Sequence, residues 1–304
     1  MAAKQMKSGM HSWKYPPAEP GAKYDPEYTP GRACGGFTVV ELLVVIGILA
    51  VLTSVLLGVV GSARRYAKAV VCMSNLRQLG VAFALYGNDY DNYAMPLAGQ
   101  SGIYWWGQKQ ADGIDHTKGF VWPYLQSELS KNSVYECPSQ RYGSYGLQGK
   151  PAGEPDDPKW ITSTYGYNGY YLCPQASGWG EKIKDRPWQK ITTVKRPALV
   201  IAFADTLINL DSSGKSPILR NTALLDPPYL YNSSGWEKNL CPTTCFRHKD
   251  RANAVFVDGH CEGLECQSGQ YVCAQAKIGS VSKNNSPYYV PDYASWPTTG
   301  RKKR

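Results

Sequence analysis

Residues 36–61 read "GFTVVELLVVIGILAVLTSVLLGVVG", and this apolar stretch decides the organisation of the chain. Glu41 is its only charged residue, and the block from Phe37 to Gly61 is 25 residues long. As an α-helix the block extends about 37 Å, which exceeds the hydrocarbon thickness of about 30 Å that a span must cross. The stretch therefore predicts a membrane-spanning helix at residues 37–61.

Two other interpretations explain less of this stretch. A secretory signal has an apolar core of about 7–15 residues before a small-residue cleavage site, whereas this run is longer and no such site follows it. A buried core helix is the second alternative, but more than about 18 uninterrupted apolar residues favour a membrane span.

The segments on either side of the span differ in pattern. Residues 1–36 are rich in proline and lack apolar periodicity, which predicts an unfolded cytoplasmic leader that starts at Met1 or Met10. Residues 62–90 repeat apolar side chains every three or four positions, as an amphipathic helix does. We expect the helix to continue to about residue 90, with these residues on its packed face: Tyr66, Val70, Met73, Leu76, Leu79, Phe83 and Tyr86.

Residues 91–304 have the pattern of an α+β domain with an antiparallel sheet. Short segments rich in Tyr, Trp, Val and Ile alternate with Gly, Pro, Asn and Ser. Residues 199–204 are one predicted strand, and residues 253–264 are a predicted hairpin. The long helix is expected to pack against this sheet.

The hairpin prediction rests on Asp258 and Gly259, which suit a two-residue turn that requires positive φ. In that register Val257 faces His260 across the ladder. Phe256 then pairs with Cys261 on the opposite face, which we expect to be the core side.

The net charge of +9 is concentrated at the chain ends. Removing residues 1–36 and the tail "RKKR" leaves 24 basic and 21 acidic residues. A body so nearly balanced gives no electrostatic reason to expect a nucleic-acid partner. The chain also has no nucleophile elbow, phosphate-binding loop or metalloprotease helix motif, so we do not expect an enzyme.

The cysteines indicate the compartment, because eight of the nine follow the span and such a content suits an oxidising environment. We therefore expect the N-terminus in the cytoplasm and residues 91–304 outside. Zinc is the alternative, with His248 and His260 nearby, but the spacings contain no two-residue knuckle pair. Disulfides are favoured over a metal site, and the candidates are Cys72, Cys137, Cys173, Cys241, Cys245, Cys261, Cys266 and Cys273.

The start of the span resembles the N-terminus of type IV prepilins and type II secretion pseudopilins. That family has Gly, then Phe-Thr-x-x-Glu, then a long apolar helix, and Gly36, Phe37 and Glu41 occupy those positions. The resemblance implies cleavage after Gly36 by a membrane prepilin peptidase and N-methylation of Phe37. It also implies that Glu41 compensates the new amine of a neighbouring subunit during assembly, which relieves the cost of a carboxylate in a membrane.

A second resemblance covers most of the remaining chain and concerns bacterial prepilin-like proteins with a C-terminal His-x9-Asp-Gly motif. His248 is followed at that interval by Asp258 and Gly259. We expect a structural role for this motif. The alternative is a metal or acid-base site, with Asp205 or His260 as its third member.

Cleavage of the leader removes Cys34 and leaves an even number of cysteines, which can pair completely. Eight cysteines allow 105 connectivities, so the full pattern is left open. We expect Cys72, on the helix, to pair with Cys137 and thereby fix the helix to the domain.

Together these observations predict a pilin-like α+β fold. The parts are a leader at 1–36, an assembly helix at 37–61, its amphipathic continuation at 62–90 and a C-terminal domain at 91–304. We expect a single-pass inner-membrane subunit of a type IV pilus-like filament or type II secretion pseudopilus, whose partners are prepilin peptidase, other pilin subunits and membrane lipid. No cofactor is expected; calcium at residues 87–92, "GNDYDN", is the alternative.

The competing function is a membrane-tethered protein whose outer domain binds a solute or a glycan. The 22 tyrosines and nine tryptophans would supply the recognition surface, including "YWW" at residues 104–106. Packing of these aromatic residues in the core is the alternative, and we favour it.

Overall fold

A computed structural model describes residues 36–99, 102–140, 144–145, 162–173, 188–211, 216–232, 235–267, 269 and 271–295. The predicted leader, apart from Gly36, and the basic tail lie outside these ranges. The chain divides into two compact units, residues 1–54 and 55–304.

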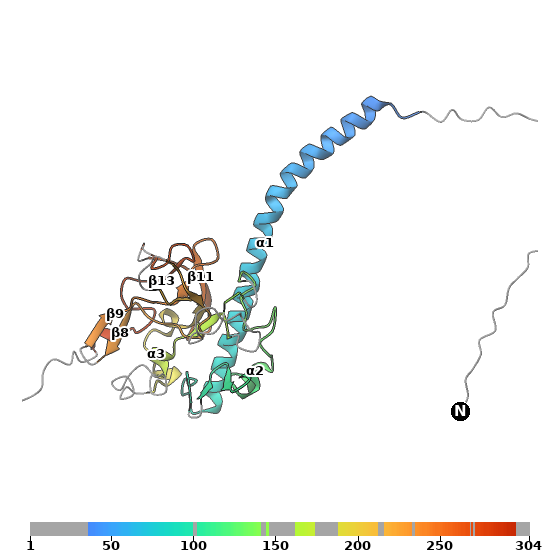
Figure 1. The fold of residues 1–304 in the computed structure, drawn as a ribbon. Helices are drawn as coiled ribbons and strands as arrows, with labels where there is room; N and C mark the ends of the chain where they lie inside the picture. Colours follow the sequence, from blue (N-terminus) through green and yellow to red (C-terminus); the bar gives the residue numbers. More distant parts are fainter. Residues whose placement is uncertain are drawn as a thin grey trace, which may run out of the picture. The chain divides into compact units, whose positions relative to one another are not determined.

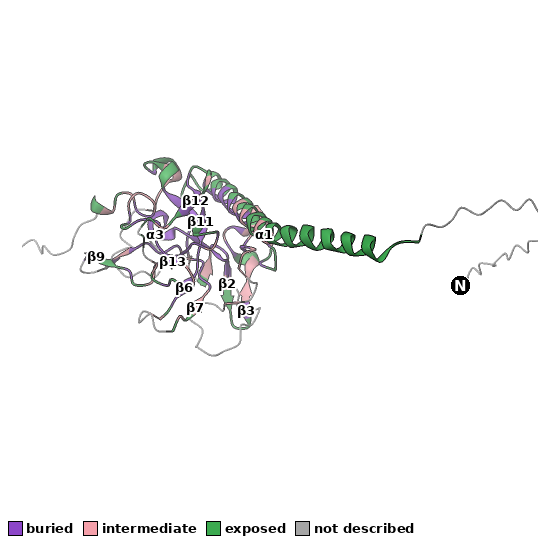
Figure 2. Cartoon of the chain, turned by 90° about the horizontal axis from the view of Figure 1, so that it is seen from above, coloured by how far each residue is buried: buried purple, intermediate pink, exposed green. Residues whose placement is uncertain are grey.

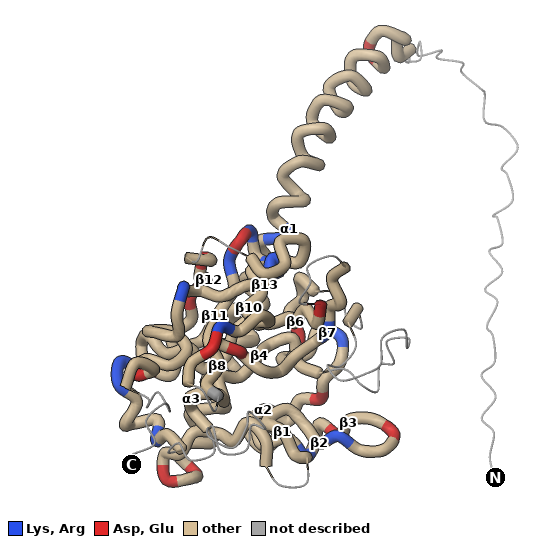
Figure 3. Tube along the Cα trace, turned by 60° about the vertical axis from the view of Figure 1, so that its left-hand side comes forward, with Lys and Arg blue, Asp and Glu red and all other residues tan. Residues whose placement is uncertain are grey.

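Helix α1 (Val39–Asp89) has 51 residues, so the prediction of one long N-terminal helix is confirmed. Its turns in the first unit expose their apolar side chains; Leu43 is 58% and Ile46 is 51% exposed. Figure 2 draws these turns in green, and Figure 3 shows them almost without charged residues. This part of α1 is long and apolar enough to cross a membrane, where exposed apolar side chains meet lipid instead of water.

In the second unit, one face of α1 packs into the domain (Figure 2). The buried residues on this face are Cys72, Asn75, Leu76, Leu79, Gly80, Ala82, Phe83, Tyr86 and Gly87. The periodicity therefore predicted the later part of the face correctly. The expectation for Tyr66 and Val70 is wrong, because they are 58% and 69% exposed and burial of the helix begins only at Cys72.

The core of the second unit is a four-stranded antiparallel sheet in the order β12-β11-β5-β4. Figure 1 labels β11 of this sheet, which lies beside helix α1. The strands are β4 (Tyr165–Tyr167), β5 (Ile201–Asp205), β11 (Arg251–Phe256) and β12 (Cys261–Glu265). Strand β5 is buried throughout, and β11 is buried at all residues but the first, as expected for central strands that are covered on both faces. The predicted α+β fold is confirmed.

Helix α1 lies directly on this sheet. Phe83 meets Phe203 of β5 edge-on, with the ring centroids 6.1 Å apart, a geometry that adds to the stabilisation from burial. One turn earlier, Gly80 faces Val255 of β11, and a Cβ built on Gly80 would lie 2.6 Å from Val255 Cγ2. The glycine therefore sets how closely the helix approaches the strand.

The predicted hairpin is present, but its register is wrong by one residue. Val255, not Phe256, pairs with Cys261, and the N–H of Phe256 donates to the carbonyl of His260 over 2.9 Å. The loop between them has three residues and ends in Gly259 at φ 90°. A three-residue loop closed by a left-handed glycine is a common hairpin geometry, and Asp-Gly suits it as well as the two-residue turn.

Shorter elements surround the central sheet. The other strands are β1 (Ile103–Tyr104), β2 (Gly107–Gln110), β3 (Gly113–Asp115), β6 (Ile208–Asn209), β7 (Leu219–Arg220), β8 (Tyr229–Asn232), β9 (Gly235–Lys238), β10 (Thr244–Cys245) and β13 (Ile278–Gly279). The short helices are α2 (Trp122–Leu125), α3 (Gly169–Leu172), η2 (His116–Lys118), η5 (Ile191–Thr193), η6 (Pro197–Leu199) and η7 (Tyr293–Ser295). Because η6 takes up the first predicted residue, the strand expected at 199–204 begins at Ile201.

The tryptophans at positions 105 and 106 belong to the core. Trp105 is fully buried and Trp106 is 4% exposed. The Trp105 ring packs 5.1 Å from Phe203, and its Nε1 donates to the carbonyl of Ala223 over 2.9 Å. These two residues therefore do not form the aromatic recognition surface of the competing function.

We predict that Gly80→Ala destabilises the domain. Overpacking a well-packed core costs about 1–3 kcal/mol, more than the gain of about 1 kcal/mol in helix propensity from replacing glycine, because the β-branched Val255 side chain is stiff. The free energy of unfolding, measured by guanidinium titration of the full chain in detergent, should fall by up to about 2 kcal/mol.

Gly263→Ala in β12 is the matched control, because a Cβ there meets only Asn253 Oδ1 at 3.5 Å and side-chain carbons further away. It should change the free energy of unfolding by less than about 0.5 kcal/mol. Equal stability of Gly80→Ala and the wild type would contradict the close approach of α1 to β11.

Candidate functional site

The first candidate site is the N-terminal end of α1, where Thr38 and Glu41 form a reciprocal capping box. Glu41 Oε2 accepts from the Thr38 N–H over 2.9 Å and from the Thr38 hydroxyl over 2.8 Å. In return, the Glu41 N–H donates to Thr38 Oγ1 over 3.2 Å. These bonds satisfy backbone donors that a helix start leaves without partners.

The sequence reasoning missed this role, although the Thr-x-x-Glu pattern before an apolar run is its signal. Phe37 is 71% exposed directly before the cap. Cleavage after Gly36 would therefore place the new amine next to a helix start that already carries a carboxylate. Glu41 thus has a local function that does not depend on any neighbouring subunit.

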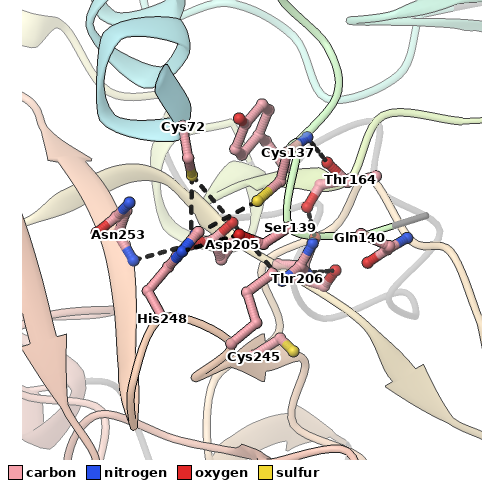
Figure 4. A network of polar contacts seen from close by, with 12 residues as sticks. Cys72, Cys137, Ser139, Gln140, Thr164, Asp205, Thr206, Cys245, His248 and Asn253 are labelled. Atoms are coloured by element: carbon pink, nitrogen blue, oxygen red, sulfur yellow. Dashed lines mark hydrogen bonds and ion pairs between the residues drawn. The ribbon is translucent and has the colours of Figure 1, made fainter. Parts of the chain in front are cut away.

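The second candidate site is a buried cluster of four side chains from four separate segments (Figure 4). Cys72 comes from α1, Asp205 ends β5, and the other two lie in the irregular segments after α2 and before β11. The members of this buried cluster are Cys72, Cys137, Asp205 and His248. Cys72, Cys137 and Asp205 are fully buried, and His248 is 8% exposed. One possible ligand atom from each side chain, a sulfur, a ring nitrogen or a carboxylate oxygen, lies within 4.8 Å of the other three.

The contacts of the buried cluster converge on one nitrogen. His248 Nε2 lies 3.2 Å from Asp205 Oδ2 and 3.3 Å from Cys137 Sγ. Cys72 Sγ completes the group, 3.4 Å from Asp205 Oδ1. A catalytic Cys-His-Asp arrangement places the thiol and the carboxylate on opposite ring nitrogens, so this geometry is a different one.

Charges in the buried cluster are mutually compensated. Burial alone would raise the pKa of Asp205, but the Arg247 guanidinium and the His248 ring outweigh it and hold that pKa below its ordinary value. Burial lowers the pKa of His248, yet hydrogen bonds to Asp205 and Cys137 raise it to about 9. Burial raises the pKa of Cys137, but the Cys72 thiol and the His248 ring lower it to about 6. Burial is the main reason that the pKa of Cys72 is raised well above its ordinary value.

Further polar groups hold the buried cluster in place. Asp205 Oδ2 also accepts from the backbone N–H of Asn253 over 2.9 Å. The side-chain Nδ2 of Asn253 donates to the carbonyl of Ala69 on α1 over 3.0 Å. Ser139 Oγ lies 3.3 Å from His248 Nδ1, on the side of the ring away from the cluster. Asn253 therefore ties β11 to α1, and Ser139 orients the imidazole.

The residues of the predicted His-x9-Asp-Gly motif do not share one site. His248 belongs to the buried cluster, whereas Asp258 pairs with His260, Oδ1 to Nδ1, at 2.6 Å. Of the two predicted third members, Asp205 partners His248 and His260 partners Asp258. Gly259 supplies the positive φ of the hairpin loop.

Cys72 and Cys137 lie together in the buried cluster as thiols. The disulfide expected between them stays a prediction. The other described cysteines lie outside the cluster: Cys173, Cys245 and Cys273 are buried, and Cys241, Cys261 and Cys266 are half-buried. At the alternative calcium segment, Asp89 Oδ2 accepts from the Tyr124 hydroxyl over 2.9 Å, and calcium there also stays a prediction.

A pocket of about 690 Å³ adjoins the buried cluster. Ser139, His248 and Asn253 reach it from the cluster side, and none of the described residues that line it is acidic. Its basic residues are Arg65, Lys68, Arg247, Lys249 and Arg251. Such a lining attracts anions, so the pocket itself is not suited to a cation.

Comparison with known proteins identifies the N-terminal site. The family model described as the prokaryotic N-terminal methylation motif matches residues 31–57. This match supports a prepilin-type protein. The matched segment contains Gly36, Phe37 and Glu41 and does not extend to His248 or the hairpin. No curated protein and no solved structure matches the chain.

We predict that Asp205→Ala strongly destabilises the domain, because it leaves Arg247 and His248 as buried cations without their carboxylate. Removing one partner of a buried ion pair costs about 3–5 kcal/mol. Asp258→Ala is the matched control, because the side chains of the pair that it breaks are 41% (His260) and 34% (Asp258) exposed and solvent-exposed pairs contribute about 0–1 kcal/mol. Thermal unfolding followed by circular dichroism checks both variants, and a similar loss for the two would contradict the central role of the buried cluster.

Proposed function

We propose that the chain is a prepilin-type subunit that is cleaved after Gly36, N-methylated at Phe37 and assembled through α1 into a filament. The filament is a type IV pilus-like fibre or a type II secretion pseudopilus. The observation that carries this proposal is the methylation motif at residues 31–57, which includes the first exposed apolar turns of α1.

The exposed apolar side chains of α1 have to be shielded from water both before and after assembly. Before assembly, lipid covers these turns, with the domain on the outer side of the membrane and the leader in the cytoplasm. In a filament, the same turns of neighbouring copies cover one another, so that apolar surface stays away from water. The proposed partners are therefore membrane lipid, a prepilin peptidase and further pilin-type subunits.

Glu41 is proposed to favour assembly through its charge. An ionised carboxylate inside a membrane costs up to about 3 kcal/mol near the centre of a helix and less toward its end. A neighbouring Phe37 amine would compensate that charge as the subunit leaves the lipid. The capping bonds to Thr38 keep the carboxylate at the helix start, where the helix dipole also favours a negative charge.

Processing is the first test. We predict that the chain isolated from its native membrane begins at Phe37 and carries one N-methyl group, which intact-mass and N-terminal peptide mass spectrometry would detect. Deletion of the peptidase should leave the leader attached. A native chain that begins at Met1 or Met10 would overturn the processing step.

Assembly is the second test, and Glu41→Gln is the informative variant because glutamine retains the capping box but lacks the charge. We predict that Glu41→Gln and Glu41→Ala are still cleaved but enter sheared filaments at least about tenfold less, the equivalent of about 1.4 kcal/mol. Glu262→Gln, at an exposed position of strand β12, is the control and should assemble normally.

If Glu41→Gln assembles normally and Glu41→Ala does not, Glu41 acts only as a helix cap and its charge is not needed for assembly. Normal behaviour of both variants would favour the second candidate function, a membrane-tethered binding protein. The basic pocket of about 690 Å³ is the specific observation in its favour, because its lining suits a small anionic solute. A catalytic function is not part of either proposal.

A further inference from the structure

We propose that the buried cluster is a four-ligand zinc site that ties helix α1 to the domain. The inference is independent of filament assembly, because it concerns only contacts within residues 55–304. Its starting point is that two sulfurs, one imidazole nitrogen and one carboxylate oxygen approach a common point from four separate segments (Figure 4). These are donor types that zinc accepts.

The distances match the edges of a zinc tetrahedron. From the ordinary Zn–S, Zn–N and Zn–O bond lengths, tetrahedral edges of about 3.5 Å are expected between sulfur and nitrogen or oxygen, and about 3.3 Å between nitrogen and oxygen. The cluster has 3.3 Å between Cys137 Sγ and His248 Nε2 and 3.6 Å between Cys72 Sγ and Asp205 Oδ2. The separation of His248 Nε2 and Asp205 Oδ2 is 3.2 Å.

The His248 imidazole is oriented as metal-binding histidines usually are. Its Nε2 faces the common point, while its Nδ1 faces the Ser139 hydroxyl at 3.3 Å. A second polar group on the far nitrogen fixes the orientation of a ligating histidine. The Asn253 N–H on Asp205 Oδ2, at 2.9 Å, plays the same part for the carboxylate.

Charge balance also fits a divalent ion. Two thiolates and one carboxylate carry three negative charges, and Arg247, whose Nε lies 3.7 Å from Asp205 Oδ1, supplies one positive charge. A Zn²⁺ ion with a neutral His248 brings the total to zero. This matters because an uncompensated charge is costly in a fully buried site.

Zinc is favoured over other ions and over a disulfide. Thiolate and imidazole ligands select zinc and similar transition metals, whereas calcium requires oxygen ligands. A bond between Cys72 and Cys137 would use only the two sulfurs. It would leave unexplained why a buried carboxylate and a buried imidazole point at the same place, and it would exclude the metal.

The proposed role is structural, because four protein ligands leave no open position for a water or a substrate. The ion would connect α1, the segment after α2, the end of β5 and the turn before β11. It would thus make the first packed turn of α1 dependent on the fold of the whole domain.

The test uses the full chain, purified from membranes in detergent without chelators. We expect about one zinc ion per chain by inductively coupled plasma mass spectrometry. Replacement of zinc by cobalt should give thiolate-to-cobalt charge-transfer absorption together with the visible bands of tetrahedral cobalt. Removal of zinc from the wild type with a strong chelator should lower the melting temperature, and added zinc should restore it.

Variants then assign the ligands. Cys72→Ser, Cys137→Ser and His248→Gln should each weaken cobalt binding by at least about tenfold. Cys261→Ser and His260→Gln are the matched controls outside the cluster and should bind like the wild type. Ser139→Ala removes only the group behind His248, so it should fold normally and still bind about tenfold more weakly. It therefore keeps the assignment testable if a ligand variant does not fold.

Three results would overturn the proposal. The first is a folded wild type that neither contains zinc nor acquires zinc or cobalt when they are supplied. The second is a native peptide map in which Cys72 and Cys137 are joined by a disulfide. The third is unchanged metal binding in both Cys72→Ser and Cys137→Ser.

Discussion

The buried carboxylate of Asp205 is the constraint on which the domain depends. A fully buried anion is tolerated only if neighbouring groups compensate it, and here they come from several parts of the chain. Arg247 and His248 approach it from the segment before β11, the Asn253 N–H donates from within β11, and Cys72 approaches from α1. Satisfying one charge therefore fixes the end of β5 against β11 and both against the helix.

Helix α1 serves two different environments along one continuous element. Its first turns present apolar side chains outward on all sides, which suits lipid or identical neighbours. Its last turns bury one face, with Gly80 close against Val255 and Phe83 against Phe203. Within residues 55–304, this packing fixes the later turns of α1 to the central sheet.

Glu41 has a local role in the single chain, and the proposed assembly would give it a second, intermolecular one. In the single chain it completes a capping box with Thr38, so the helix start is stable without a partner. The same bonds hold the carboxylate beside the residue whose amine processing would release. A glutamate that is already ordered loses less conformational entropy when it meets a charged partner than a free side chain would.

Local signals in the sequence determined the elements. The uncharged run after Glu41 and the three-to-four periodicity from Leu76 to Tyr86 act over neighbouring turns, so they predicted the long helix and the later part of its packed face. The Asp258-Gly259 pair predicted a hairpin but not its register, because loops of two and three residues both accept it. The burial of Trp105 and Trp106 agrees with the interpretation favoured from the sequence, that large aromatic residues in a strand-rich domain usually pack in the core.

Only the tertiary structure decided which distant residues meet. The sequence left a shared site of His248 and Asp258 open only as the alternative to a structural role, and it could not decide between Asp205 and His260 as the third member. In the fold the two motif residues are apart, and His248 meets Asp205 while Asp258 meets His260. The exposure of Tyr66 and Val70 was equally beyond the sequence, because periodicity shows which face a residue is on but not where the domain begins to cover it. The sequence by itself determined the helix, the hairpin and the N-terminal motif, whose causes are local. The fold alone brought Cys72, Cys137, Asp205 and His248 together, because compensation of a buried charge depends on neighbours in space.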